Sequence, residues 1–102
     1  MKWIEKILEV KPYTIKTLWN DGSVRLINLE EFIKKKSLNP NSSFKKLKNS
    51  DVFIKVKCDG TSLYWENLIK YKDLDGGEKD GNLDISPELL FELSYTQLKQ
   101  VI

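Results

Sequence analysis

The stretch YTIKTLWNDGSVRLIN, residues 13–28, decides the fold class of this chain. Apolar and polar side chains alternate on both sides of Asp21-Gly22, and such alternation is typical of two half-buried β-strands. Asp-Gly favours a two-residue type I′ turn, because both central residues of that turn need positive φ. With this turn at the tip, Trp19 faces Val24 and one face is mostly apolar. The stretch therefore predicts a β-hairpin.

A second stretch, VFIKVKCDGTSLYWE (residues 52–66), repeats the pattern. Its apolar residues recur with a period of two, and Asp59-Gly60 again suits a tight turn. With that turn at the tip, Val56 faces Leu63 on an apolar face. We therefore expect a second β-hairpin.

The segments around the hairpins predict one more strand and three short helical pieces. Residues 3–10 predict an N-terminal strand, with a short amphipathic helix as the alternative. Residues 28–36 predict a helix, because the asparagine at their start can cap it and the lysines at their end suit the helix dipole. Residues 44–47 add one helical turn. Residues 86–93 begin with Ser-Pro-Glu, which is typical of a helix N-terminus.

Residues 66–82 form a polar, acidic, glycine-rich insertion, in which we expect a loop. Within it, residues 68–72 favour a strand that prolongs the sheet, and residues 73–82 are expected to be the least ordered part of the chain. The carboxylates do not match an EF-hand, because Glu78 stands where that loop needs glycine. Residues 94–102 are a weakly patterned tail.

These elements predict a single α+β domain over residues 1–102. We expect an antiparallel sheet of about five strands, built from the two hairpins and the N-terminal strand and covered on one face by two or three short helices. The expected core consists of Trp19, Val24, Leu26, Phe32, Ile33, Ile54, Val56, Leu63, Trp65, Leu89, Leu90 and Leu93.

The composition argues against catalysis. Histidine is absent, which removes Ser-His and Cys-His nucleophilic pairs. The only cysteine, Cys58, lies in a strand pattern and is interpreted as a small buried thiol. We expect no enzymatic activity, no cofactor and no metal site. Residues 1–10 do not have the pattern of a signal peptide or a membrane span, so a cytoplasmic location is expected.

Charge is distributed unevenly along the chain. Residues 1–57 hold 13 Lys and Arg against 6 Asp and Glu, whereas residues 58–102 hold 4 against 9, which leaves a net charge of +2. A basic half can mark a nucleic-acid surface or a site for an acidic partner. The alternative is that the two halves pair within one sheet and their charges partly offset each other.

Several short sequence features follow one another along the chain in a characteristic order. They are an aromatic residue before an Asp-Gly turn, an Asn-Leu entry into a helix, a Phe-containing turn, a Trp, and a Pro-Glu-containing segment. They are carried by Trp19, Asp21, Gly22, Val24, Asn28, Leu29, Phe44, Leu47, Phe53, Trp65 and residues 84–91, DISPELLF. In this order they resemble a bacterial family of small proteins catalogued as domain of unknown function 2442. Here residues 66–82 replace the short turn that members have before the last helix.

The resemblance implies no established activity. Genes of the family often stand beside that of another small uncharacterised domain, in an arrangement like a toxin–antitoxin pair. The resemblance therefore implies a non-catalytic protein-interaction module, such as the antitoxin-like member of a two-gene pair. Its ligand would be a protein partner or a second copy of the chain. We expect no membrane association and identify no small-molecule substrate. The alternative function is nucleic-acid binding by the lysine-rich helices. The candidate interaction residues are Lys34, Lys35, Lys36, Lys45, Lys46, Lys48, Phe53 and Tyr64.

Overall fold

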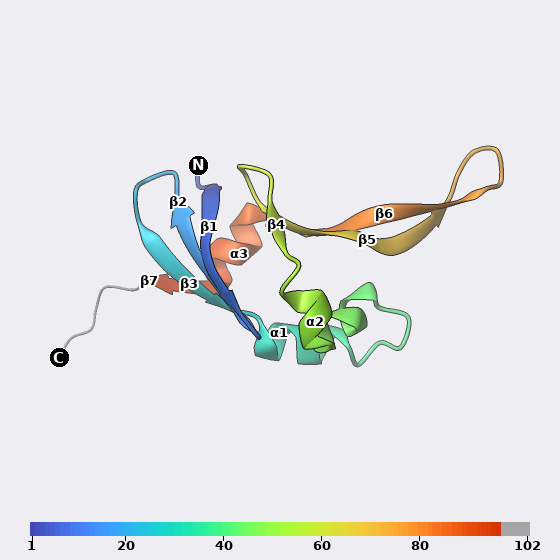
Figure 1. Cartoon of the computed structure of the whole chain (residues 1–102), viewed down its shortest axis with the longest axis horizontal. Helices are drawn as coiled ribbons and strands as arrows, with labels where there is room; N and C mark the ends of the chain where they lie inside the picture. Colours follow the sequence, from blue (N-terminus) through green and yellow to red (C-terminus); the bar gives the residue numbers. More distant parts are fainter. Residues whose placement is uncertain (97–102) are drawn as a thin grey trace.

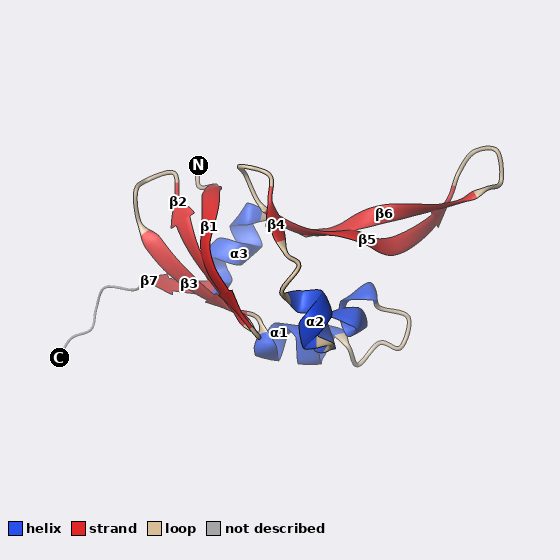
Figure 2. Cartoon of the chain, in the orientation of Figure 1, coloured by secondary structure: helices blue, strands red, loops and turns tan. Residues whose placement is uncertain are grey.

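The computed structural model describes residues 1–96, and residues 97–102 lie outside the described part. The elements are β1 (Ile4–Lys11), β2 (Thr14–Trp19), β3 (Val24–Asn28), α1 (Glu30–Lys36), the 3₁₀ helix η1 (Ser43–Lys48), α2 (Ser50–Phe53), β4 (Lys57–Cys58), β5 (Leu63–Lys72), β6 (Glu78–Ile85), α3 (Pro87–Leu93) and β7 (Ser94–Thr96). Figures 1 and 2 show their arrangement.

The α+β class is confirmed, and the strands divide between two antiparallel sheets rather than one. Sheet A has the order β1-β2-β3-β7, and sheet B has the order β4-β5-β6. The edge of β1 meets the loop before β5, where the Ile4 amide donates to the Thr61 carbonyl at 2.8 Å. Buried side chains of both sheets belong to one hydrophobic cluster. The two sheets therefore share a single core.

The first hairpin is confirmed, but the predicted turn is wrong. Trp19 faces Ser23 across a three-residue loop, and its carbonyl accepts a hydrogen bond from the Gly22 amide at 2.9 Å. A type I′ turn needs positive φ at Asp21 as well, yet within residues 1–96 Gly22 is the only residue of this loop with positive φ, at 84°. The Asp21 carboxylate instead accepts the Ser23 amide at 2.9 Å. This geometry is that of a three-residue loop closed by a glycine bulge.

The longer loop shifts the register by one residue and reverses the faces of β3. Val24 pairs with Leu18 instead of Trp19. Ile27 therefore joins Trp19 on the buried face, and the expected core residues Val24 and Leu26 are only half-buried. A slip of one position always exchanges the two faces of a strand.

The second predicted hairpin exists only near its tip. Cys58 pairs with Leu63, because the loop between them has four residues rather than two. The segment before it is not a strand: Asn49 caps α2 by accepting the Asp51 amide at 2.9 Å. Ile54, which we expected in the core, follows that helix and is 48% exposed.

The helical predictions over residues 28–36, 44–47 and 86–93 are confirmed. Asn28 accepts the Glu30 amide at 3.0 Å before α1, and Ser86 caps α3. Helix α3 packs on the buried face of sheet A, where the Phe91 ring lies edge-on to Trp19 at 5.3 Å. The Arg25 guanidinium stacks over the same ring at 4.1 Å.

The observed core overlaps the expected one only in part. Of the expected residues, those that are buried are Trp19, Ile33, Val56, Leu63, Trp65 and Leu90. The side chains Phe32, Leu89 and Leu93 are half-buried. The buried residues missing from the prediction are Ile4, Ile15, Ile27, Leu29, Leu47, Phe53, Leu83 and Ile85.

The strand predicted over residues 68–72 is confirmed, as part of a longer strand over residues 63–72. The loop predicted for the rest of residues 66–82 is wrong, because residues 63–72 and 78–85 form the hairpin β5–β6. Its turn repeats the first one: Gly76 has φ of 85°, and the Asp73 amide donates to the Gly77 carbonyl at 2.7 Å.

We call residues 66–82 the arm. It extends past α2, away from sheet A, and gives the molecule its longest dimension of 55 Å (Figure 1). The radius of gyration, 14.8 Å, accordingly exceeds the roughly 13 Å of a compact domain of this length.

Part of the predicted tail is ordered. Residues 94–96 form β7, in which Tyr95 pairs with Leu26 of β3. The remainder of the predicted tail lies outside the described residues.

Candidate functional site

The arm is an exposed two-stranded ribbon. Trp65 and Leu83 are buried at its base, and in the described part of the chain no side chain between them is buried. Tyr71 is 52% exposed, and Leu74 at the tip is fully exposed. Near the base Leu68 and Ile69 are half-buried against the core, and beyond them the ribbon is largely in water. A two-stranded hairpin in water is marginally stable by itself.

Cross-strand contacts join the two strands of the arm. Lys70 pairs with Asp80 at 2.8 Å, and this hydrogen bond raises the pKa of Lys70. On the other face, a Cβ atom added to Gly81 would lie 3.0 Å from Ile69 and 3.3 Å from the Tyr71 ring. Glycine at this position therefore lets both side chains lie across the ribbon, leaving an apolar stripe on the arm.

A bulge sets the direction of the arm at its base. Trp65 pairs with Leu83 and Ile69 with Gly81, so three residues of β5 stand opposite Asn82 alone. Within this bulge Asn67 has a φ of 58°. Because a bulge bends the strand that carries it, the arm departs from the line of the core sheet.

The edge of β5 is open along the arm. Strand β4 pairs only with Leu63 and Tyr64, and within residues 1–96 no other strand pairs with this edge of β5. From Trp65 onward the edge therefore presents backbone groups that a further strand could use.

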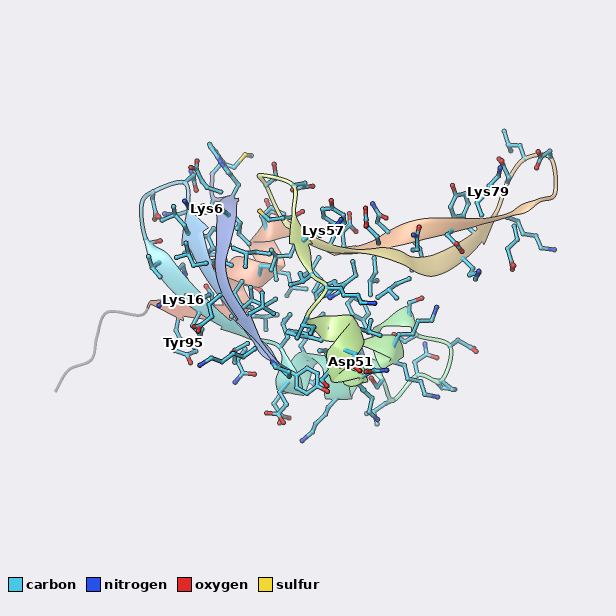
Figure 3. All side chains as sticks on the ribbon, in the orientation of Figure 1. Lys6, Lys16, Asp51, Lys57, Lys79 and Tyr95 are labelled. Atoms are coloured by element: carbon cyan, nitrogen blue, oxygen red, sulfur yellow. The ribbon has the colours of Figure 1, made fainter. Side chains whose placement is uncertain are left out.

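Two hollows flank this open edge, and together we call them the edge groove. The first has a volume of about 490 Å³ and is lined by Val52, Lys55, Val56, Lys57, Trp65, Glu66, Asn67 and Leu68. The second has a volume of about 540 Å³ and is lined by Pro40, Asn41, Ser42, Ser43, Lys45, Lys46 and Lys70. The Lys46 ammonium joins their walls by donating to the Leu68 carbonyl at 2.7 Å. Figure 3 labels Lys57 on β4, where the hairpin of β5 and β6 begins.

The edge groove is electropositive. Its lining residues include five lysines and one carboxylate, Glu66. Glu66 pairs with Lys57 at 3.0 Å and raises the pKa of that ammonium. In the described part of the chain no ion pair engages Lys45 or Lys55. Ammonium groups beside an open strand edge suit an extended ligand with acidic side chains.

The predicted lysines are divided between two surfaces. Lys45 and Lys46 lie in the edge groove, while Lys34 and Lys48 line a smaller hollow of about 120 Å³ next to Tyr13. Lys34 also pairs with Glu31 at 3.7 Å.

The remaining predicted residues lie outside the edge groove. Lys35 and Lys36 are exposed in the last turn of α1, and the Lys36 ammonium lies over the Phe32 ring at 5.6 Å. Phe53, expected on an exposed face, is completely buried, where its ring contacts Tyr13 and Trp65. That prediction is wrong.

Tyr64 is half-buried and pairs with Lys57 and Asp84 in sheet B. Sequence reasoning missed Lys55, Lys57 and Lys70, which share the groove with Lys45 and Lys46. The strand propensity of residues 68–72 was the available signal for the arm. No sequence signal showed that its edge would face η1.

Other kinds of site find little support. Within residues 1–96, no group of three or more His, Cys, Asp or Glu side chains is placed to hold a metal ion. Cys58 is half-buried, and desolvation raises the pKa of its thiol. No helix in the described range is long and apolar enough to cross a membrane.

Comparisons of the chain with protein-family models, with curated proteins and with solved structures find no match. The resemblance to domain of unknown function 2442 stays a prediction.

Proposed function

We propose that this protein is a non-catalytic protein-interaction module, which binds an extended acidic segment by strand addition along β5. One observation carries the proposal: the open edge of β5 runs from Trp65 to Lys70 between the two lysine-lined hollows. In strand addition, backbone hydrogen bonds supply affinity and pockets for alternate side chains supply specificity.

The dimensions suit a short strand. Five residues of β5 line the groove: Trp65, Glu66, Asn67, Leu68 and Lys70. Because the bulge sets Trp65–Lys70 opposite only Leu83–Asp80 of β6, this edge is roughly 10 Å long at about 3.3 Å per residue. Val52, Val56 and Leu68 supply an apolar floor for every second side chain. The lysines supply partners for acidic side chains that point the other way.

Two related functions are less well supported. The antitoxin-like role rests on the family resemblance, and the edge groove is compatible with it because such a protein must bind a partner chain. Nucleic-acid binding would use the lysines alone. Of the six candidate lysines, Lys34 and Lys48 line one hollow, Lys45 and Lys46 line another, and Lys35 and Lys36 line neither. Nucleic-acid binding also leaves the open edge of β5 without a specific role.

The proposal is tested by fluorescence anisotropy with a labelled peptide of alternating Glu and Val. The wild-type protein should bind it, and the double variant Lys45→Glu/Lys55→Glu should bind at least tenfold more weakly. The matched control is Lys6→Glu/Lys16→Glu on sheet A, far from the arm in Figure 3, which should bind like the wild type.

A second probe separates strand addition from charge attraction. Methylating alternate backbone nitrogens of the peptide keeps its charge but removes donors, so binding should be lost. Equal binding of the methylated peptide would overturn the proposal. So would tighter binding of a single-stranded oligonucleotide than of the peptide, which would favour the lysines as a nucleic-acid surface.

A further inference from the structure

We propose that the segment received by the edge groove is the arm of a second copy, so that two chains form a two-fold dimer through β5. This inference rests on the proposed function, since it names the occupant of the same groove. In the dimer the β5 strands lie side by side and antiparallel, giving a four-stranded ribbon of β6, β5 and their two counterparts.

Charge complementarity favours this occupant. The tip of the arm, residues 73–80, holds four carboxylates and one lysine. The edge groove holds five lysines and one carboxylate. The acidic tip and the basic groove thus lie toward opposite ends of the arm. A second copy supplies an acidic extended segment without a different partner.

Symmetry brings the complementary ends together. Two-fold pairing of identical strands is antiparallel, so the tip of each arm lies beside the base of the other. Because of the bulge, Trp65–Lys72 lies opposite six residues of β6, Leu83–Glu78, which span roughly 17 Å at about 3.3 Å per residue and so cover the edge of the groove. Each chain fills the groove of its neighbour, and the assembly closes at two copies.

The dimer also covers the apolar groups of the arm. Ile69 and Tyr71 share a face with Gly81, and pairing would join the two stripes across the ribbon. Leu74, fully exposed at the tip, would reach the groove floor formed by Val52 and Val56 of the other copy. Four paired strands with an apolar stripe are stable where one hairpin is marginal.

The test is size-exclusion chromatography with light scattering on the full chain and two variants. The tip variant Asp75→Lys/Glu78→Lys leaves the ion pair between Asp73 and Lys79 in place. The groove variant is Lys45→Glu/Lys55→Glu. We expect a dimer for the wild type and a monomer for each variant alone.

Mixing the two variants gives the decisive result. In a mixed dimer, the lysine tip of one chain meets the glutamate groove of the other, and the second contact is wild type on both sides. The mixture should therefore recover the dimer, which also shows that both variants are folded. Lys6→Glu/Lys16→Glu, the sheet A control, should stay dimeric. A monomeric wild type, a dimeric tip variant or a mixture that stays monomeric would each overturn the inference.

The Glu-Val peptide separates this inference from the proposed function. It is titrated into the tip variant, whose groove is intact and empty. The tip variant should bind the peptide as a monomer. A monomeric wild type together with peptide binding would refute the dimer and leave the groove as a site for another protein. A monomeric wild type together with no peptide binding would refute both.

Discussion

The Lys46 ammonium lies 2.7 Å from the carbonyl oxygen of Leu68 and so connects η1 to the base of the arm. This carbonyl lies in the bulge and points out of the β5–β6 ladder. A side chain outside the sheet thus occupies an acceptor that a neighbouring strand would otherwise use. Because Lys46 is exposed, an incoming strand can displace it at little cost.

Replacing Lys46 should loosen the arm without unfolding the protein. We expect Lys46→Ala to change the free energy of unfolding by less than about 0.5 kcal/mol, because the side chain is exposed. Amide hydrogen exchange in residues 66–72 should become faster. Lys48→Ala, on the same 3₁₀ helix, is the control and should leave that exchange unchanged. Equal exchange in both variants would show that the link does not hold the arm.

Trp19 should be among the most costly residues to truncate. Its ring is buried against Phe91, and its indole nitrogen donates to the Thr17 hydroxyl at 2.9 Å. We expect Trp19→Ala to lower the free energy of unfolding by roughly 3–5 kcal/mol in urea denaturation. Lys16→Ala, on the opposite face of β2, should cost less than about 0.5 kcal/mol. A similar loss in both variants would contradict the observed faces of β2.

Gly22 and Gly76 form a matched pair, because both close three-residue loops at φ of 84–85° with open space where a Cβ would lie. Alanine at either position should strain its loop by roughly 1–2 kcal/mol. Gly22→Ala should lower the melting temperature, since its hairpin belongs to the core. Gly76→Ala should mainly accelerate hydrogen exchange in the arm, which can open locally. Equal losses of melting temperature would mean that the arm unfolds together with the core.

Asp21 should make stability depend on acidity. Its hydrogen bonds with Lys2 at 2.8 Å and with the hydroxyl and amide of Ser23 hold the pKa of the carboxyl well below its usual range. The folded state thus favours the charged form. Its contribution is complete above the unfolded pKa of about 3.9 and is lost as pH falls toward the lower folded value.

Asp21→Asn should consequently flatten the loss of stability below about pH 4, as measured by urea denaturation across a pH series. Lys2→Met, which removes the main cause of the shift, should flatten it partly. A variant profile parallel to that of the wild type would show that Asp21 does not contribute.

Local sequence chemistry identified several elements correctly and missed details set by backbone conformation. The alternation around Asp21 predicted the first hairpin, and the pairing of β2 with β3 confirms it. The turn type was wrong because Asp-Gly suits two geometries. The Asp21 carboxylate accepts the Ser23 amide, which stabilises the three-residue loop and moves every β3 side chain to the other face.

The edge groove illustrates what could not be read from the chain. Lys45 and Lys46 were candidates because they form part of a basic run. Lys55, Lys57 and Lys70 join them only because the bulge at Asn67 directs the arm over η1 and α2. Phe53 failed as a surface residue because a short helix capped by Asn49 turns it into the core.

The sequence by itself determined the α+β class, the first hairpin and the helices, because alternation, caps and glycines act over a few neighbouring residues. The tertiary structure alone decided that an acidic, polar stretch becomes an arm and that its open edge faces lysines from three other segments. Such a juxtaposition depends on contacts between residues far apart in the chain, and no local pattern records them.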